Sequence, residues 1–420
     1  MSETESNNIT VKAISPFASV SIAEYRNLLM SRFTFTMALR MLTTVLGWWV
    51  YNLTNDPFAI GLIGLSEVIP AVGLALYAGH VIDISEKRKL MLICISLYGI
   101  AAIIFFLLST NQTHDYLSNN NIARVVYLVV FCTGIVRSFS GPTFSVLVAN
   151  IVPRELLPNA ITWNQGTYLS ASVTGHAVGG LLIAGINITG TLLVICALLL
   201  FAVVSMSLIK RKPTAARGER KTWDSVRDGL VFVFKTKELL GAISLDLFAV
   251  LFGGAVAMVP VFARDILHIG AEGFGFLNAA SDMGAIVIVI LLTLFPLKRR
   301  QGYALMYAVA GFGICIIIFG LSKFFWLSFL VLLTSGMLDG FSVVIRGTIT
   351  QLKTPDSMRG RVTSVNSMFI NSSNELGQFE SGVMAKLMGV VPSVIFGGCM
   401  TLLVVVVTWV KAPALRKMEY

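Results

Sequence analysis

Long apolar runs separated by short polar segments make up most of this chain, and each run is about as long as a whole helix. Most runs reach the roughly 20 residues that an α-helix needs to cross a bilayer. Twelve runs fit this description, and they cover residues 28–53, 58–80, 88–109, 123–150, 160–185, 187–210, 238–264, 273–295, 303–321, 324–350, 361–387 and 390–411. The pattern predicts an all-α polytopic membrane protein with twelve transmembrane helices.

Basic residues in the connections orient these predicted helices, because Lys and Arg prefer cytoplasmic loops. With the N-terminus inside, the basic positions on the side of both termini are Lys87, Arg88, Lys89, Arg154, the segment 210–237, Lys298, Arg299, Arg300, Lys353, Arg359, Arg361, Lys411, Arg416 and Lys417. The opposite side holds Arg124, Arg264 and Lys323, all at helix ends. The asymmetry predicts that both termini are cytoplasmic.

Composition supports the membrane assignment and excludes several other classes. Hydrophobic residues make up 55% of the chain, charged residues 13%, and the mean hydropathy is +0.80. The net charge of +10 lies in short loops, which is a topology pattern and argues against nucleic acid as a partner. All five cysteines fall inside apolar runs, and no phosphate-binding loop or nucleophile–base arrangement is present. We therefore expect no enzyme activity, no metal and no cofactor.

The longest polar connection, 211–237, divides the runs into two groups of six. A shift of 202 residues along the chain also superposes several positions, which are Gly134 on Gly336, Arg137 on Asp339, Gly175 on Gly377 and Gly180 on Gly382. Two like-oriented halves follow from this repeat. The predicted organisation is a cytoplasmic segment 1–27, a bundle 28–210, a linker 211–237, a second bundle 238–411 and a cytoplasmic tail 412–420.

The connection between the second and third runs reads GHVIDISEKRK. It resembles the loop signature G-x-x-x-D-[RK]-x-G-[RK]-[RK] of the major facilitator superfamily. The matching positions are Gly79, Asp83, Lys87 and Arg88, whereas Ile84 and Glu86 depart from the pattern. Beyond anchoring the helix, we expect this stretch to act as a gate, whose contacts hold the outward-facing state together and break when the cytoplasmic side opens.

Two further motifs are similar to elements of the same superfamily. Arg137 to Gly141 resembles the R-x-x-x-G signature of proton-coupled members, and Gly175-His176-Ala-Val-Gly179-Gly180 resembles the antiporter element G-P-x-x-G-G with His in place of Pro. Longer phrases such as NIVPRELLPNAITWNQ and QLKTPDSMRGRVTSVNSMFINSSNELGQFESG resemble the bacterial branch of drug and siderophore exporters, with enterobactin-exporter-like and macrolide-efflux-like members.

The resemblance implies a fold and an activity. The fold is two pseudo-symmetric six-helix bundles. The activity is export of a small amphipathic molecule, such as a siderophore or drug, across the bacterial inner membrane by alternating access, with protons as the countertransported ion. A monomer in the lipid bilayer is expected. Two alternatives stay open, namely a facilitator or importer of a small nutrient and a non-transporting membrane sensor.

Ionisable residues inside the predicted spans are candidate functional groups, because each costs roughly 2.5–3.5 kcal/mol at the centre of a bilayer unless it is paired or hydrated. Glu67 and Asp282 can each load and release a proton, or can form a permanent ion pair, with Arg40 as a possible partner. Arg40 itself is too deep to reach the interface, whereas Arg32 lies near the helix end as an interfacial anchor. The role of Asp246 stays open.

The remaining candidates lie in spans four, five, ten and eleven. Arg137 and Asp339 can line opposite cavity walls, bridge the halves or form an inert pair. The imidazole of His176 is either a proton carrier or a neutral, hydrogen-bonded group at a glycine packing motif. A polar stripe lines a hydrated substrate path or satisfies neighbouring helices, and it consists of Asn371, Asn374, Glu375 and Gln378. Arg40 and Arg137 favour an anionic ligand.

Overall fold

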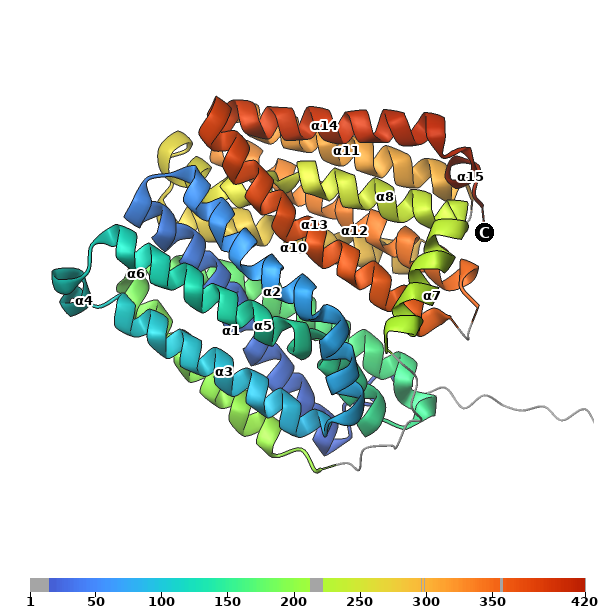
Figure 1. The fold of residues 1–420 in the computed structure, drawn as a ribbon, viewed down its shortest axis with the longest axis horizontal. Coiled ribbons are helices and arrows are strands. Elements are labelled where there is room, and N and C mark those ends of the chain that lie inside the picture. Colours follow the sequence, from blue (N-terminus) through green and yellow to red (C-terminus); the bar gives the residue numbers. More distant parts are fainter. Residues whose placement is uncertain (1–14, 212–221, 296, 298, 356–357, 420) are drawn as a thin grey trace, which may run out of the picture.

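The computed structural model describes residues 15–211, 222–295, 297, 299–355 and 358–419, and all its regular elements in this part are helices. They form two groups that lie side by side (Figure 1). The helices before the linker form the N-terminal half, drawn in blue to green, and those after it form the C-terminal half, drawn in yellow to red. The predicted all-α fold in two bundles is therefore confirmed.

The N-terminal half contains five long helices and one short one. Its elements are α1 (Ala23–Thr54), α2 (Pro57–Ile84), α3 (Lys87–Leu108), α4 (Asn111–Tyr116), α5 (Asn119–Ile151), a 3-10 turn (Arg154–Leu156) and α6 (Leu157–Ser207). The backbone of α6 leaves helical geometry at Ile186 and Asn187, and Asn187 has a φ of 63°. This break separates two spans that run in opposite directions, as the sequence predicted for residues 160–185 and 187–210.

The C-terminal half follows the linker helix α7. Its elements are α7 (Thr222–Lys235), α8 (Lys237–Phe252), a 3-10 segment (Gly254–Met258), α9 (Val259–Val261), a π-helical turn (Phe262–Ile266), α10 (Gly270–Leu294), α11 (Gln301–Leu321), α12 (Phe325–Lys353), α13 (Arg359–Met388), α14 (Val390–Lys411) and α15 (Pro413–Arg416). The predicted boundary at 211–237 stays a prediction, since residues 212–221 lie outside the described part.

Nine stretches in the described part are long and apolar enough to cross a membrane. They include α6 with its preceding turn as one stretch and omit α1 and α13, which carry more polar residues. Counting α1, α13 and the two arms of α6 separately would supply the expected twelve. The number twelve therefore stays a prediction, whereas a multi-pass membrane protein is supported directly.

Two helix pairs make the main contacts between the halves: α2 packs on α13, and α6 packs on α10. The linker helix α7 also packs on α2. We call the end of the bundle where α1 begins and α14 finishes the terminal end, and the opposite end the far end. A Cβ added to Gly180 would lie 2.6 Å from the Cα of Gly275, and one added to Gly382 would lie 2.7 Å from the Cα of Gly61. These backbones touch because neither partner has a side chain. Gly180 and Gly382 are one of the predicted repeat pairs, so the repeat is visible in the packing.

The halves part towards the terminal end. Gly79 lies five helical turns beyond Gly61, on the same face of α2, yet nothing lies within 4 Å of a Cβ built there. Among the described residues, every hydrogen bond, ion pair and ring contact that joins the two halves lies at the level of Arg137 or nearer the far end. The two bundles are therefore closed against each other at the far end and, apart from the linker helix α7 on α2, open at the terminal end.

Candidate transport site

A three-membered ion cluster lies where α2, α5 and α13 meet. The guanidinium Nη1 of Arg137 on α5 lies 2.6 Å from Oε1 of Glu67 on α2 and 2.5 Å from Oε1 of Glu375 on α13. The Glu67 contact is within the N-terminal half, whereas the Glu375 contact crosses to the C-terminal half. One cation thus holds two carboxylates that belong to different halves.

The backbone of α5 explains why Arg137 reaches Glu67. A Cβ added to Gly134 would lie 2.6 Å from the carbonyl oxygen of Glu67, so α5 and α2 are in direct contact one turn before Arg137. The cluster is partly accessible, with 36% of the Arg137 side chain exposed, 24% of Glu67 and 13% of Glu375. These charges are therefore neither fully desolvated nor on the surface.

The other junction, between α6 and α10, carries Asp282. The hydroxyl of Ser172 on α6 donates to Oδ2 of Asp282 at 2.5 Å, and Nε2 of His176 lies 3.8 Å from the same oxygen. The opposite ring nitrogen of His176 is 2.8 Å from the hydroxyl of Thr44 on α1. This junction therefore holds one carboxylate through a hydroxyl, with an imidazole nearby but beyond hydrogen-bond distance. Among the described residues, it has no guanidinium within ion-pair distance of Asp282.

Arg40 and Arg32 on α1 lie beside Tyr168 of α6. Nη2 of Arg40 donates to the Tyr168 hydroxyl at 2.6 Å, and its guanidinium carbon is 5.7 Å from the ring centroid. The guanidinium carbon of Arg32 is 5.2 Å from the same ring and 4.5 Å from the ring of Phe144. Arg32 was predicted to be an interfacial anchor, yet its guanidinium packs on two rings within the N-terminal half.

A second ion pair lies inside the C-terminal half. Asp246 on α8 accepts from Nη1 of Arg346 on α12, and both side chains are 7% exposed. Nε of Arg346 also donates to the carbonyl and the hydroxyl of Ser342, at 3.3 and 3.2 Å. Asp339 lies two turns before Arg346 on α12 and is attracted by it, but forms no hydrogen bond or ion pair with any residue that the structure describes.

Sequence reasoning missed Arg346, although a signal for it exists. It lies seven residues after Asp339 and therefore on the same face of α12. A buried carboxylate at Asp246 needs a cation at matching depth, and Arg346 is the basic residue inside the described part of that helix before its last turn. Asp246 is thus part of a buried ion pair.

Two of the open pairings do not occur among the described residues. Arg40 was a possible partner of Glu67 or Asp282, but Glu67 is bound by Arg137 and Arg40 by Tyr168. Arg137 and Asp339 do not form a pair, because Arg137 bonds Glu67 and, across the halves, Glu375. The repeat places both residues at matching depths of their helices, and depth alone does not choose a partner.

The polar stripe of α13 is divided between two environments. Glu375 reaches Arg137, and Gln378 packs on α2, where a Cβ on Gly64 would lie 2.8 Å from its Oε1. Asn374 is exposed and donates to the carbonyl of Ile370 on its own helix at 3.0 Å. The side chain of Asn371 lies outside the described residues.

The basic residues of the predicted gate stretch bond backbone carbonyls. Lys87 donates to the carbonyl of Ser85 at 2.9 Å, and Arg88 donates to the carbonyl of Ser207 at 2.6 Å. Both of these bonds stay within the N-terminal half. The side chain of Asp83 lies outside the described residues, so the gate role of this stretch stays a prediction.

The glycines of span five set the position of Arg40. A Cβ added to Gly175 would lie 2.7 Å from Cβ of Arg40, and one added to Gly179 would lie 3.2 Å from the Cα of Met41. Gly180 faces α10 instead. These glycines bring α6 against α1 on one side and against α10 on the other. The part of α1 that carries Arg40 therefore lies next to Asp282.

Polar contacts close the far end between the halves. The Tyr51 hydroxyl on α1 donates to Asp265, and Arg264 donates to the side-chain oxygens of Asn52 at 3.0 Å and Asn55 at 2.5 Å. A further set joins α2 to α13, where Nζ of Lys386 lies 2.9 Å from Oδ2 of Asp56. The sequence had placed Arg264 only as a helix end, because nothing local indicates a partner more than two hundred residues away.

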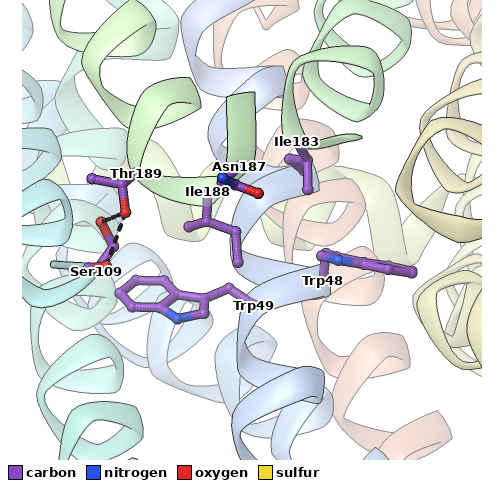
Figure 2. A pocket seen from close by; sticks show the side chains of 7 residues that line it. All are labelled: Trp48, Trp49, Ser109, Ile183, Asn187, Ile188 and Thr189. Atoms are coloured by element: carbon purple, nitrogen blue, oxygen red, sulfur yellow. Dashed lines mark hydrogen bonds between the residues drawn. The ribbon is translucent and has the colours of Figure 1, made fainter. Parts of the chain in front are cut away.

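A pocket of about 300 Å³ lies apart from the charged groups, at the far-end break of α6 (Figure 2). Its lining residues are Trp48, Trp49, Ser109, Ile183, Asn187, Ile188 and Thr189. The hydroxyls of Ser109 and Thr189 bond each other at 3.0 Å along one wall, and Trp48 stacks on Phe274 of α10. This pocket contains no ionisable side chain, so the charge chemistry belongs to the junctions between the halves.

The comparisons with known proteins agree with this architecture. The family described as transmembrane secretion effector matches residues 14–420, which is nearly the whole chain. The chain belongs to this family of the major facilitator superfamily. Among the described residues of this transporter, no group of three or more His, Cys, Asp or Glu side chains is arranged as a metal site.

Curated relatives of this transporter are distant. The MFS-type transporter YkuC of Bacillus subtilis is 24% identical over 350 residues, which is 77% of this chain and 76% of YkuC. The enterobactin exporter EntS of Shigella flexneri is 26% identical over 188 residues, or 43% of this chain and 46% of EntS. The predicted membership of the superfamily, with exporters among the relatives, is confirmed.

Solved transporters share the fold at low identity. A single-site mutant of the nucleoside transporter NupG has a TM-score of 0.73 and 14% identity, covering 92% of this chain and 99% of NupG. The POT family transporter PepTSo has a TM-score of 0.74 and 12% identity, covering 95% of this chain and 99% of PepTSo. These likenesses concern the fold alone.

Proposed function

We propose that this transporter exports a small amphipathic molecule across the bacterial inner membrane by alternating access, in exchange for protons. The observation that carries the proposal is the position of Arg137, which binds Glu67 in its own half and Glu375 in the other half. A cation shared between the halves is a contact that must break when the halves rock apart at the far end. Glu375 can take a proton when this contact breaks, whereas Glu67 stays beside Arg137 in the N-terminal half.

The sequence of events follows from electrostatics. In the conformation described here, burial opposes ionisation of Glu375, and the bond to Arg137 favours it. Formation of this bond therefore promotes release of a proton from Glu375. When the far end opens, Glu375 moves away from Arg137 and can accept a proton from that side. The return movement then carries the proton inward and expels it as the Arg137 bond forms again. Binding of substrate from the terminal end drives the movement that opens the far end.

The direction of exchange depends on orientation. If the terminal end is cytoplasmic, as the loop charges predict, the present conformation is inward-facing and ready to bind cargo from the cytoplasm. Asp282, in contact with Ser172 across the second junction, is a further proton site that the same movement would expose. The relatives named as enterobactin exporters support a siderophore or a related amphipathic metabolite as cargo.

Transport into everted membrane vesicles tests the exchange. We expect vesicles that contain the protein to accumulate a candidate siderophore or drug only while a proton gradient, acidic inside, is present, and Glu375→Gln to lose this dependence. Arg137→Gln, which removes the shared cation, is expected to lose the dependence as well. Its matched control is Arg124→Gln, because Arg124 lies on the same helix and its side chain bonds only that of Asn121 among the described residues. Uptake that persists after the gradient is collapsed would indicate a facilitator and overturn the antiport proposal.

Distances between spin labels test alternating access without knowledge of the cargo. Labels at Tyr116 and Phe324 report the far end, and labels at Ile84 and Leu352 report the terminal end; all four side chains are exposed. We expect Glu375→Gln or acidification to lengthen the first distance and shorten the second. A sensor that does not transport would keep both distances fixed.

A further inference from the structure

In the part of the chain that the structure describes, four arginines lie inside the helix bundles and away from helix ends. They fall into two classes. Arg137 is bound by two carboxylates, and Arg346 is paired with Asp246. Arg40 and Arg32 form no ion pair with any carboxylate in the described part of the chain. Their contacts there are the hydroxyl of Tyr168 and the faces of aromatic rings.

An unpaired arginine in a membrane protein needs an explanation. The guanidinium does not lose its proton at any physiological pH, so Arg40 and Arg32 cannot become neutral as a buried carboxylate can. Asp282 attracts Arg40 but is held by Ser172 and lies outside ion-pair distance. Two cations beside one tyrosine ring repel each other. An anion between them would reduce this repulsion and would give both cations a partner of opposite charge.

The position of the pair suits a ligand. Tyr168, Ser172 and His176 are spaced by four residues and therefore share one face of α6. Ser172 and His176 meet Asp282 on α10, so this face is turned to the other half. Tyr168 and Arg40 are partly exposed, and the halves part from this level towards the terminal end. A ligand that enters from that end meets Arg32 first and Arg40 about two helical turns deeper.

We propose that Arg40, Arg32 and Tyr168 form the subsite for an anionic group of the cargo, which is thereby an organic acid with a planar oxyanion on an apolar or aromatic body. A carboxylate and a catecholate both present two oxygens in a plane, which matches the donor geometry of a guanidinium. The rings of Tyr168 and Phe144 provide the apolar side of the subsite. The structure thus removes Arg137 from the expected anion site and adds Arg32.

The proposal rests on the proposed function, in that it names the cargo of the same transporter, but its test is a binding experiment. The purified protein in nanodiscs of phosphatidylcholine is titrated with 1-naphthoate and with 1-naphthamide, which is the neutral molecule of the same shape. We expect naphthoate to bind and naphthamide to bind at least about tenfold more weakly, as expected when a charge-assisted hydrogen bond is missing. Equal binding of acid and amide would overturn the anion subsite, whatever the transport assay shows.

Variants separate a direct contact from a structural effect. Arg40→Gln is expected to weaken naphthoate about tenfold or more and leave naphthamide unchanged, Arg40→Lys to recover part of the loss, and Tyr168→Phe to cost about threefold. Asp282→Asn should tighten naphthoate, since it removes a like charge near the anion. Equal loss of acid and amide in Arg40→Gln would mean that Arg40 only supports the fold, and would contradict the proposal.

Two further measurements make the result decisive. Without ligand, Arg40→Gln should melt no lower than the parent protein, because it removes a cation that lacks an ion pair. A large fall in its melting temperature would show that Arg40 is already paired. Replacing part of the phosphatidylcholine by phosphatidylglycerol should leave naphthoate binding unchanged; competition by this anionic lipid would instead assign the site to lipid headgroups.

Discussion

The two junctions between the halves have the same kind of close backbone contact, but they carry different charged groups. Gly61 meets Gly382 where α2 packs on α13, and Gly275 meets Gly180 where α6 packs on α10. Beside the first glycine pair lies the Arg137 ion cluster, whereas beside the second lies Asp282, bound by a hydroxyl and near an imidazole. The repeat therefore preserves where the chains approach each other, and the charges that surround each approach have diverged.

This difference teaches how one architecture can divide its tasks. A cation shared by two carboxylates from different halves ties the halves together and responds to their movement. A carboxylate without a guanidinium within ion-pair distance is free to bind a proton or to answer a charged ligand. In the proposed mechanism the α2–α13 junction is the lock, whose Glu375 takes up a proton when the halves part. The α6–α10 junction is the sensor, whose Asp282 is a second proton site beside the cargo.

Removing Arg137 should have the largest effect. Arg137→Gln leaves two carboxylates facing each other across the junction, which we expect to destabilise the far-end-closed state by about 2–3 kcal/mol; that is below the range for a fully buried pair, because 36% of the Arg137 side chain is exposed. The far-end label distance measures this shift. Ser172→Ala at the other junction is expected to cost less, about 1.5 kcal/mol, which is the low end of the range for a hydrogen bond to a charged group because the Asp282 side chain is 26% exposed.

If Ser172→Ala opened the far end as widely as Arg137→Gln, the division into lock and sensor would be wrong. Arg124→Gln serves again as the control, since it removes the same charge from the same helix outside both junctions.

Filling the glycine contacts should have the next largest effect, and an equal one at both junctions. A side chain at Gly180 or Gly382 would enter the backbone of the facing helix, and overpacking of this kind costs about 1–3 kcal/mol. We expect Gly180→Val and Gly382→Val to open the far end by similar amounts, as the label distances would report. Gly166→Val, where nothing lies within 4 Å, should have no such effect.

Unequal responses of Gly180→Val and Gly382→Val would show that one junction alone closes the far end. In that case the two glycine contacts of the repeat would not contribute equally to closure of the far end.

The far-end ion pair should have the smallest effect. Lys386 and Asp56 have 56% and 36% of their side chains exposed, and exposed pairs contribute about 0–1 kcal/mol. Lys386→Gln is therefore expected to shift the far-end distance slightly, and the shift should vanish at high salt because screening already weakens the pair. A shift as large as that of Arg137→Gln would show that the contact which ties the halves together lies at the far end of the junction and not in its middle.

Much of the architecture was predictable from the sequence for a physical reason. A helix that crosses lipid must satisfy its own backbone, so length and apolarity identify it without knowledge of its neighbours. The repeat of glycines 202 residues apart likewise pointed to positions of close approach, and Gly180 and Gly382 lie at such positions. Helix detail escaped, such as the 3-10 and π-helical segments that follow α8 within the predicted span 238–264.

The functional residues were recognised as a set, because an ionisable side chain deep in a span is costly and therefore conspicuous. Glu67, Arg137, Asp282 and Glu375 were all candidates, and all four lie at the junctions between the halves. Arg346 and Tyr168 were missed. The first follows a charged residue on the same helix face, whereas a tyrosine in an apolar run carries no signal until an arginine is seen beside it.

Partner choice was decided by the tertiary structure alone. Arg137 binds Glu375, 238 positions away, rather than Asp339 at the equivalent depth, and Arg40 is left with a tyrosine. Depth along a helix follows from the sequence, but rotation about the helix axis and the lateral order of helices follow from packing, which depends on small residues far apart in the chain. The sequence therefore determined which charges enter the membrane, and only the packed helices determined which of them meet and which remain for a ligand.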